Sequence, residues 1–283
     1  MNLKRLTLSL ILFVLVGSNL VVWVSAASNR KKDLVVKVYD VGQGDSIFIR
    51  TPDNYKILVD GGPNNKVVDY LNKDLGLNDR SIDLIVSTHP QADHMTGLIE
   101  TLKKFQVKKV IASNVTNSTA QFKLWNDTLS NNHLKLDYVY AGESITLSDQ
   151  VTLQILWPSS PNPKVTNLND AAVVIKLSYG SFDMLLTADA DMNSQPYTTS
   201  TNHIEVLKVP HHGSRTALRE DFLKQLSPDA SVISVGAHNT YGHPNADLVT
   251  LLSRNTKKIY RTDQNGTVEF VSNGTTWYTS VEK

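Results

Sequence analysis

The sequence predicts an α/β protein in which two β-sheets pack face to face and helices cover their outer surfaces. Short β-branched runs occur in two groups, within residues 34–60 and 151–189, and stretches with helical spacing follow each group. Polar clusters come directly after several of these runs. The 283 residues are 41% hydrophobic and 19% charged, which fits one large globular domain.

The first half alternates expected strands with helices. The strands lie at residues 34–41, 46–50, 56–60, 82–87 and 108–113. The first three are separated only by turn-forming residues, so we expect them to be consecutive antiparallel strands. Between the last two, apolar residues recur at helical spacing from Leu98 to Phe105, which predicts a strand–helix–strand unit. Residues 116–133 indicate a second, more polar helix.

The second half repeats this arrangement. Its expected strands lie at residues 151–158, 171–180, 181–189, 203–210, 230–236, 258–262 and 267–271, with helices near 216–226 and 246–254. The turn Tyr179-Gly180-Ser181 should join two of these strands in a hairpin. Residues 158–170 are the most polar connector, and we expect them to form a surface loop near the mouth of the site.

The N-terminal segment has the layout of an export signal. Lys4 and Arg5 precede an apolar run that extends to about Ala27. A run of about 20 apolar residues is also long enough to cross a bilayer as a helix. We therefore expect residues 1–32 to be a cleaved signal peptide or a membrane anchor helix. Residues 33–283 are then one folded domain that works outside the cytoplasm, in contact with the membrane if the segment is uncleaved.

Charge and cysteine content narrow the function classes. The formal net charge is +1, which gives no whole-protein attraction for nucleic acid or for an acidic surface. The chain has no cysteine, which excludes disulfides, a cysteine nucleophile and thiolate-bound zinc. A bound metal must therefore have His, Asp, Glu, Asn or Gln as its ligands.

The motif "HPQADH" follows an apolar strand and gives the strongest chemical signal. His89, Gln91, Asp93 and His94 can converge on one point from a tight loop. Neutral imidazoles and a carboxylate at this spacing suit Zn²⁺, Mn²⁺ or Fe²⁺. Such an ion lowers the pKa of a bound water and provides a nucleophile near neutral pH. The alternative is a helix N-terminus that Asp93 merely caps.

Two aspartates end other apolar strands. Asp189 in "LLTADAD" is costly to bury unless it is paired or bound to metal, so it is a candidate bridging ligand. A surface turn is the alternative for this residue. Asp60 in "ILVDGG" is expected to orient a ligand histidine by accepting its hydrogen bond, although the glycines after it also allow a purely structural tight turn.

Two further histidine motifs follow strands. "KVPHHGS" contains His211 and His212, and adjacent residues on an extended backbone point in opposite directions. We expect one of them to face the metal and the other to donate a proton to a leaving group, but the sequence does not indicate which. "YGHPNAD" contains His243.

Taken together, these motifs resemble the metallo-β-lactamase superfamily, and more narrowly the soluble hydrolase domain of ComEC-type DNA-uptake competence proteins. The matching pieces, in order, are "YDVGQGDSIFIR", "ILVDGGP", "STHPQADHMTGL", "LLTADAD", "VLKVPHHGS", "VISVGAHNTYGHP" and "RTDQNGTVEF". The resemblance implies a four-layer αββα sandwich, one or two divalent ions (zinc or manganese) and hydrolysis, with phosphodiesters such as DNA as the favoured substrates.

The resemblance also implies roles for single residues. The metal ligands and proton-transfer groups it implies are His89, Asp93, His94, Asp189, His211, His212 and His243. We expect Asp93, His211 and His212 to take part in catalysis, and one ion to be bound through Asp93, His94, Asp189 and His243.

Three departures from the family pattern affect this site. Gln91 stands where relatives carry His or Asp. The metal site that uses His89 and Gln91 is therefore expected to bind its ion weakly or to stay empty. Ala171 and Ala172 stand where relatives carry polar residues at the mouth, and Ala188 replaces a glycine.

Three functions fit these observations. The first is an exported or anchored metal-dependent phosphodiesterase or nuclease. The second is a non-catalytic module with a degenerate site that binds metal or nucleic acid. The third is a hydrolase of a small ester or lactone. The lysines at 103, 104, 108 and 109 carry little weight for DNA binding, and no segment indicates an obligate protein partner.

Overall fold

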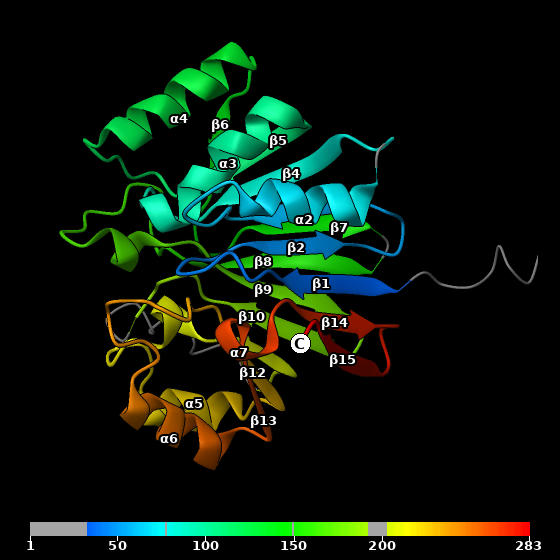
Figure 1. Cartoon of the computed structure of the whole chain (residues 1–283), viewed down its shortest axis with the longest axis vertical. Helices are drawn as coiled ribbons and strands as arrows, with labels where there is room; N and C mark the ends of the chain where they lie inside the picture. The colour runs from blue at the N-terminus through cyan, green and yellow to red at the C-terminus, as the bar shows by residue number, and fades with distance from the viewer. Residues whose placement is uncertain (1–32, 77, 149, 192–202) are drawn as a thin grey trace, which may run out of the picture. The chain divides into compact units, whose positions relative to one another are not determined.

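The computed structural model describes residues 33–76, 78–148, 150–191 and 203–283. These residues form two β-sheets with helices on their outer faces (Figure 1). The expected signal or anchor helix within residues 1–32 lies outside the described residues. The longest described helix has 13 residues, and no helix in this part of the chain combines the length and apolarity needed to cross a bilayer.

The first sheet has eight strands in the order β15-β14-β1-β2-β3-β4-β5-β6. They are β1 (Leu34–Val38), β2 (Ile47–Arg50), β3 (Lys56–Val59), β4 (Ser81–Ser87), β5 (Gln106–Ala112), β6 (Leu136–Tyr138), β14 (Val268–Ser272) and β15 (Trp277–Val281). Strands β1, β2 and β3 are antiparallel neighbours, as predicted. Strands β3 to β6 run parallel, so the carboxyl ends of β3 and β4 meet at one edge.

The second sheet has seven strands in the order β13-β12-β11-β10-β9-β8-β7. They are β7 (Ser144–Ser148), β8 (Val151–Trp157), β9 (Val174–Tyr179), β10 (Phe182–Leu186), β11 (Val206–Lys208), β12 (Ala230–Ile233) and β13 (Lys258–Arg261). The predicted hairpin joins β9 and β10, in which Tyr179 pairs with Phe182. Strands β10 to β13 are parallel, and the loops after β10 and β11 carry the second group of polar motifs.

Helices cover both outer faces, which confirms the predicted αββα sandwich. Helices α2 (Lys66–Leu75), α3 (Ala92–Lys104) and α4 (Ala120–Asn131) pack on the first sheet, and α5 (Glu220–Leu226) and α6 (Ala246–Asn255) pack on the second (Figure 1). Strand β2 shows why the sequence builds these layers. Ile47 and Ile49 lie in the core between the sheets, whereas Phe48 packs under the helices, because alternate side chains of a strand face opposite sides.

Some elements were not predicted from the sequence. Helix α2 buries only Val67, Val68 and Leu71, a narrow apolar stripe in an otherwise polar segment. Strands β6 and β15 lie at opposite ends of the first sheet, and their mixed polar composition gives weak strand signals. These elements extend the sheets and cover them, and the histidine and aspartate motifs lie elsewhere.

Candidate metal centre

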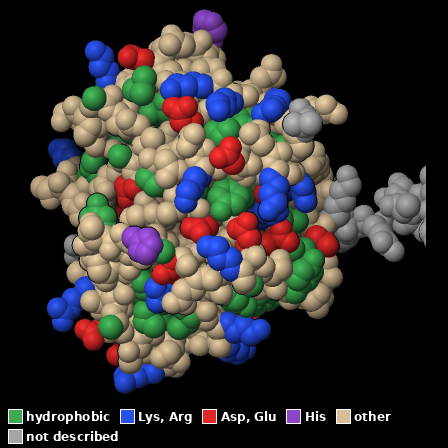
Figure 2. Space-filling model, viewed as in Figure 1, with side chains coloured by type: hydrophobic (Ala, Val, Ile, Leu, Met, Phe, Trp, Pro, Cys, Tyr) green, Lys and Arg blue, Asp and Glu red, His purple; other side chains and the backbone are tan. Residues whose placement is uncertain are grey.

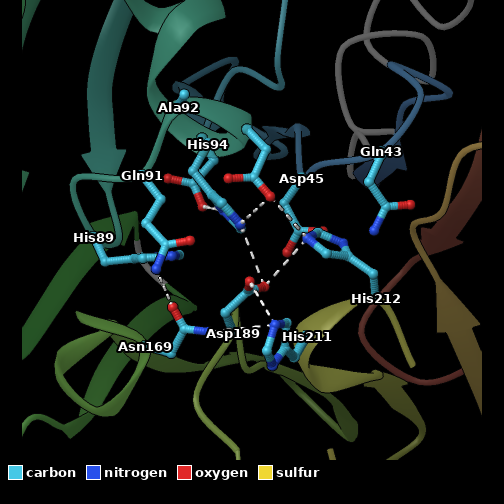
Figure 3. Close-up of polar contacts among 12 residues, drawn as sticks. Gln43, Asp45, His89, Gln91, Ala92, His94, Asn169, Asp189, His211 and His212 are labelled. Atoms are coloured by element: carbon cyan, nitrogen blue, oxygen red, sulfur yellow. Dashed lines mark hydrogen bonds and ion pairs between the residues drawn. The ribbon is translucent and has the colours of Figure 1, made fainter. Parts of the chain in front are cut away.

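The site lies where four buried strands end. Asp60 follows β3, His89 follows β4, Asp189 follows β10 and His212 follows β11. The first two strands belong to one sheet and the last two to the other, so the loops of both sheets meet at the site. Figure 3 shows His94, Asp189 and His212 pointing toward one another at this edge.

Helix α3 is held against the turn after β3 by backbone contacts. Gly61 N–H donates to the carbonyl of His94 at 2.7 Å, and Gly97 N–H donates to the carbonyl of Gly62 at 3.0 Å. A Cβ atom on Gly97 would lie 1.8 Å from the carbonyl oxygen of Gly61, which no side chain tolerates. The glycines therefore bring the first turn of α3, which carries Asp93 and His94, directly onto the end of β3.

Several non-glycine residues at the site have left-handed backbone conformations. The φ angles are 56° at Asp60, 46° at Ala188, 47° at His211 and 52° at His212. Such conformations are unfavourable for residues with a Cβ atom and cluster at functional sites. At the two histidines, the backbone is a left-handed turn rather than the extended chain that we assumed, and this turn directs the His212 ring inward.

Four ligand atoms converge on one point. The groups Asp93, His94, Asp189 and His212 each offer one atom, and these atoms all lie within 4.8 Å of one another. Asp189 Oδ1 is 3.3 Å from His94 Nε2 and 3.5 Å from His212 Nε2. Asp93 Oδ2 is 3.4 Å from His212 Nε2 and 3.9 Å from His94 Nε2. Ligands about 2.1 Å from a tetrahedral ion lie roughly 3.4 Å apart, so this set fits one divalent cation.

The burial of these atoms supports the same conclusion. Several ligand atoms among the described residues are buried and make no hydrogen bond. They are His94 Nε2, His212 Nε2, Asp189 Oδ1 and His89 Nε2. Buried polar atoms almost always have a partner, because leaving one unsatisfied costs about 1–3 kcal/mol. Unpaired atoms that face a common point are satisfied when a cation binds between them.

Hydrogen bonds fix which ring nitrogen each histidine presents. His94 Nδ1–H donates to Asp60 Oδ2 at 2.8 Å, and His212 Nδ1–H donates to the carbonyl of Ser234 at 2.9 Å. The Nε2 lone pairs of both rings therefore face the cluster. Asp60 lies where the sequence analysis placed it, as the acceptor that orients a ligand histidine.

Asp60 orients His89 indirectly, through the hydroxyl of Thr88. Thr88 Oγ1 donates to Asp60 Oδ2 at 2.7 Å, so it accepts from His89 Nδ1–H at 3.0 Å. The Nε2 atom of His89 is again left with its lone pair. Burial, with the nearby charge of His94 adding to it, lowers the pKa of His89 to about 3, so this ring is neutral at physiological pH.

The electrostatics of the cluster favour positive charge. Burial alone would raise the pKa of Asp93, but His94 and His212 lower it to about 2. Asp189 is likewise held well below the usual pKa of its carboxyl by the same two histidines, despite its complete burial. In turn, burial acts to lower the pKa of His94, but Asp189 and Asp60 raise it well above its usual value. Both carboxylates are therefore ionised at neutral pH, and a divalent cation that binds here would replace the imidazole protons as their charge partner.

The structure places His243 outside this group of ligand atoms. Its ring centroid is 5.7 Å from that of His211, and its Nδ1 is 3.5 Å from Gln43 Nε2. The ring is only half-buried, on the loop between β12 and α6. His212 occupies the ligand position that we expected His243 to fill, because the left-handed turn after β11 carries it between Asp93 and Asp189.

The position beside His89 is occupied by amides. Gln91 Nε2–H donates to Asn169 Oδ1, and Asn169 Nδ2–H donates to His211 Nε2 at 3.3 Å (Figure 3). Amide nitrogens that donate in this way do not bind cations. His89 therefore has a free ring nitrogen but no anionic neighbour at the position of Gln91, in keeping with a single strong cation site.

One expectation about this region differs from the structure. Ala171 and Ala172 are fully buried rather than exposed at the mouth, and Ala172 packs in the core between the second sheet and its helices. The short 3₁₀ turn Leu168–Ala171 causes this difference, because it turns Asn169 toward the site and the alanines away from it. Asn169 was missed because it lies in a polar loop whose residues all have similar sequence signals.

A buried ion pair beside the cluster was also missed. Lys208 Nζ lies 2.7 Å from Asp45 Oδ2, and both side chains are almost fully buried. Asp45 Oδ1 lies 3.5 Å from His212 Nδ1, so the pair adjoins a ligand ring. A lysine within the apolar run "VLKVP" was the available signal, since a buried lysine requires a charged partner.

Sequence comparison places this site in a known family. A family model described as the metallo-beta-lactamase superfamily matches residues 39–238, and this range holds all four ligands of the cluster. The chain belongs to the metallo-beta-lactamase superfamily. Membership in this superfamily and the convergent ligand atoms together support a metal-dependent hydrolase.

Individual relatives agree with the narrower resemblance. ComE operon protein 3 of Bacillus subtilis is 26% identical over 257 residues, which cover 83% of this chain and 32% of that protein. Competence protein ComA of Neisseria gonorrhoeae is 26% identical over 254 residues, which cover 85% of this chain and 32% of that protein. The chain thus spans about a third of the length of these relatives. A superfamily domain of the ComEC type, predicted from the motifs, is confirmed.

A solved structure supports the fold. The metallo-beta-lactamase fold protein YhfI from Bacillus subtilis superposes with a TM-score of 0.53 at 12% identity. The superposition covers 82% of this chain and 98% of YhfI. At this identity the likeness concerns the sandwich architecture alone.

Proposed function

We propose that this protein is a metal-dependent phosphodiesterase that cleaves nucleic acid or a related phosphodiester. The observation that carries the proposal is the convergence of Asp93, His94, Asp189 and His212 on one point, with buried ligand atoms left unpaired. The motif resemblance to ComEC-type DNA-uptake competence proteins, with which these relatives agree, supports nucleic acid as the substrate class. A divalent cation held by these residues would supply Lewis-acid activation of a phosphoryl oxygen and an acidified water.

The chain's own residues prepare the site for such a substrate. Asp93 and His211 are the solvent-accessible members, with 33% and 27% of their side chains exposed, so a substrate can approach from their side. His211 is held by Asn169, whose Nδ2–H group donates to its ring. Asp60 and Ser234 keep the rings of His94 and His212 in fixed orientations, so little reorganisation is needed when substrate binds.

The lysine stretch on and after α3 does not form a free basic surface. Lys103 pairs with Glu100 at 2.7 Å, and Lys108 pairs with Asp83 at 2.6 Å. Lys109 pairs with Asp137 at 3.0 Å. Figure 2 likewise shows blue and red side chains interspersed on the viewed face. These lysines therefore add little attraction for a polyanionic substrate, whereas a cation at the site would attract it.

Export belongs to the same proposal. The basic residues and the apolar run of residues 1–32 support secretion, or attachment to the membrane by a single N-terminal segment. The domain would then act on phosphodiesters outside the cytoplasm.

One observation favours a second candidate. The amide chain of Gln91 and Asn169 removes ligands from the position beside His89, which is what a module that binds metal without turnover would show. An assay of turnover separates the two functions, because only the first predicts multiple cleavage events for each protein molecule.

The test uses purified protein loaded with Mn²⁺ or Zn²⁺. We expect hydrolysis of bis(p-nitrophenyl) phosphate and of single-stranded DNA, with little activity on p-nitrophenyl acetate or a simple lactone. His94→Ala should abolish the activity, whereas His133→Ala, which changes an exposed histidine on a surface turn, should retain it. Cleavage of the carboxylic ester or lactone alone would reassign the protein to that hydrolase class. Metal binding without any turnover would identify the non-catalytic module.

A further inference from the structure

Tyr241 stands out on the surface beside the metal-ligand cluster. With 72% of its surface exposed, it is the most exposed large hydrophobic side chain of the described residues. It lies on the loop between β12 and α6, in the motif that also contains His243. An exposed aromatic ring offers a flat apolar face on which a planar ligand can stack.

A series of ring contacts leads from the cluster to this tyrosine. The Tyr241 ring stacks on His243 with centroids 5.8 Å apart and an interplanar angle of 25°. His243 in turn packs edge-on against His211 at 5.7 Å. His211 Nε2 is 3.9 Å from Asp189 Oδ2, a member of the cluster. Tyr241 is thus two ring contacts away from the accessible side of the cation site.

The loop that carries Tyr241 is fixed by its own hydrogen bonds. Asn239 Oδ1 accepts from Tyr241 N–H at 3.2 Å and from His243 N–H at 3.0 Å. Asn239 Nδ2–H donates to the carbonyls of Gly236 at 2.9 Å and His243 at 2.7 Å. One side chain therefore ties together the backbone on both sides of the tyrosine.

Both ends of this loop are also attached to the site. Gly236 N–H donates to Gln43 Oε1 at 3.1 Å, and Asn245 N–H donates to the carbonyl of Gly213 at 2.8 Å. Gly213 directly follows the ligand His212. The ring of Tyr241 is therefore held at a defined place relative to the cluster, which reduces the conformational entropy lost when a flat ligand stacks on it.

We infer that Tyr241 is a stacking platform for a nucleobase next to the phosphodiester that the site cleaves, so that the substrate is single-stranded nucleic acid. This inference rests on the proposed phosphodiesterase function. Every base has a flat π-face, so an exposed tyrosine binds unpaired bases with little sequence preference. Bases inside a duplex are already stacked on one another and cannot reach such a ring unless they are flipped out.

The test compares two substrates that release the same leaving group. Thymidine 5′-(p-nitrophenyl phosphate) contains a base, and methyl p-nitrophenyl phosphate does not. We expect Tyr241→Ala to lower the ratio of kcat/KM for the nucleotide ester to that for the methyl ester about tenfold, whereas Tyr241→Phe keeps the ratio. Tyr278→Ala, which removes another exposed tyrosine on β15, serves as the matched control and should leave the ratio unchanged.

An equal effect of Tyr241→Ala on both esters, or no effect on either, would overturn the inference while leaving the phosphodiesterase function intact. If wild-type protein hydrolyses neither ester, the proposed function fails, and binding then decides the inference separately. In that case fluorescence anisotropy with a labelled oligothymidylate should show an affinity about tenfold weaker for Tyr241→Ala than for Tyr241→Phe. Equal affinities would reject the platform.

Discussion

Asp60 Oδ2 lies 2.8 Å from Nδ1 of His94, and this contact fixes a ring whose other nitrogen faces the ligand cluster. The same carboxylate accepts from the backbone N–H and the hydroxyl of Thr88, at 2.9 and 2.7 Å. Asp60 therefore joins the ends of β3 and β4 and sets the tautomer of His94 directly.

Replacing this carboxylate should weaken metal binding. We expect Asp60→Asn to lower the affinity for Mn²⁺ or Zn²⁺ by about 10- to 100-fold, because the amide no longer holds the His94 ring in place by charge. Competition with a chromogenic chelator measures the change. Asp83→Asn serves as the control, because Asp83 is a buried carboxylate that lies away from the site and accepts from Lys56 N–H. The metal affinity of this variant should match that of the wild type. Equal affinities for the two variants would contradict this role of Asp60.

His212 and His243 should differ sharply when each is replaced. His212 Nε2 belongs to the ligand cluster, so His212→Ala should lose the bound metal and the hydrolytic activity. His243→Ala should keep its metal, because this ring lies outside the cluster against His211. Elemental analysis of both variants after dialysis decides the matter. Loss of metal in the His243 variant would show that the ligand set rearranges when an ion binds.

A carboxylate at position 91 should create a second cation site. Gln91→Asp replaces an amide donor with an anionic ligand near the unpaired Nε2 of His89. We expect the metal content to rise from one ion to two for each chain, as measured by mass spectrometry of the native protein. Gln106→Asp makes the same change on the exposed side of β5 and should bind no additional ion. If the metal content of Gln91→Asp stays at one ion, a carboxylate at position 91 does not complete a second site with His89.

The contact between Gly97 and Gly61 predicts a large loss of stability on substitution. In Gly97→Ala, the new methyl group would overlap the Gly61 carbonyl, so α3 must move away from the turn after β3. We expect the free energy of unfolding to fall by about 3 kcal/mol, the upper range for overpacked interiors. Urea denaturation in the presence of a chelator measures this without the contribution of metal. Thr96→Ala, on the outer side of the same helix, should change stability by less than about 1 kcal/mol.

One surface carboxylate gives a pH-dependent prediction far from the site. Hydrogen bonds from Lys56 and Ser81 hold the pKa of Asp79 below its usual value. A depressed pKa in the folded state means that this stabilisation is present above the unfolded pKa of about 4 and disappears as the pH falls through the folded value. Since 36% of the side chain is exposed, solvent screening limits the effect to less than about 1 kcal/mol.

Asp79→Asn should therefore be less stable than the wild type at pH 7, and this difference should narrow toward pH 3. Thermal unfolding at the two pH values provides the measurement. Asp127→Asn changes an exposed carboxylate on α4 and should show no difference at either pH. A stability gap for Asp79→Asn that persists or widens toward acid pH would contradict the assignment.

Much of the fold could be predicted from the sequence because its strands are strongly apolar. Runs such as Ile47–Arg50 and Phe182–Leu186 have the β-branched and aromatic residues that pleated, buried surfaces favour. Helix α2 escaped detection because its three buried residues are embedded in a polar segment. Boundaries near the site were drawn too long, since residues such as Asp60 and Asp189 lie after the strand and not within it.

The candidate site was predictable to the extent that its residues lie in motifs that come after apolar strands. Asp189 follows β10, whereas Asp93 and His94 lie in the first turn of α3, which begins after β4, and the three converge as expected. The choice of His212 depends on φ angles near +50° in its turn, which the letters "HHGS" do not reveal. Asn169 depends on a turn in a polar loop, and Asp45 on an ion pair with Lys208. These partners are far apart in the chain, so only the folded structure identifies them.

The division of the ligands between the two sheets affects how the protein matures. Asp93 and His94 are synthesised after strands β1 to β4 of the first sheet, whereas Asp189 and His212 follow later, after strands β10 and β11 of the second. One carboxylate and one imidazole make a poor chelate, so a nascent chain that ends before β10 cannot retain its ion. The complete ligand set therefore exists only when both sheets are in place, and a bound ion would stabilise their correct docking.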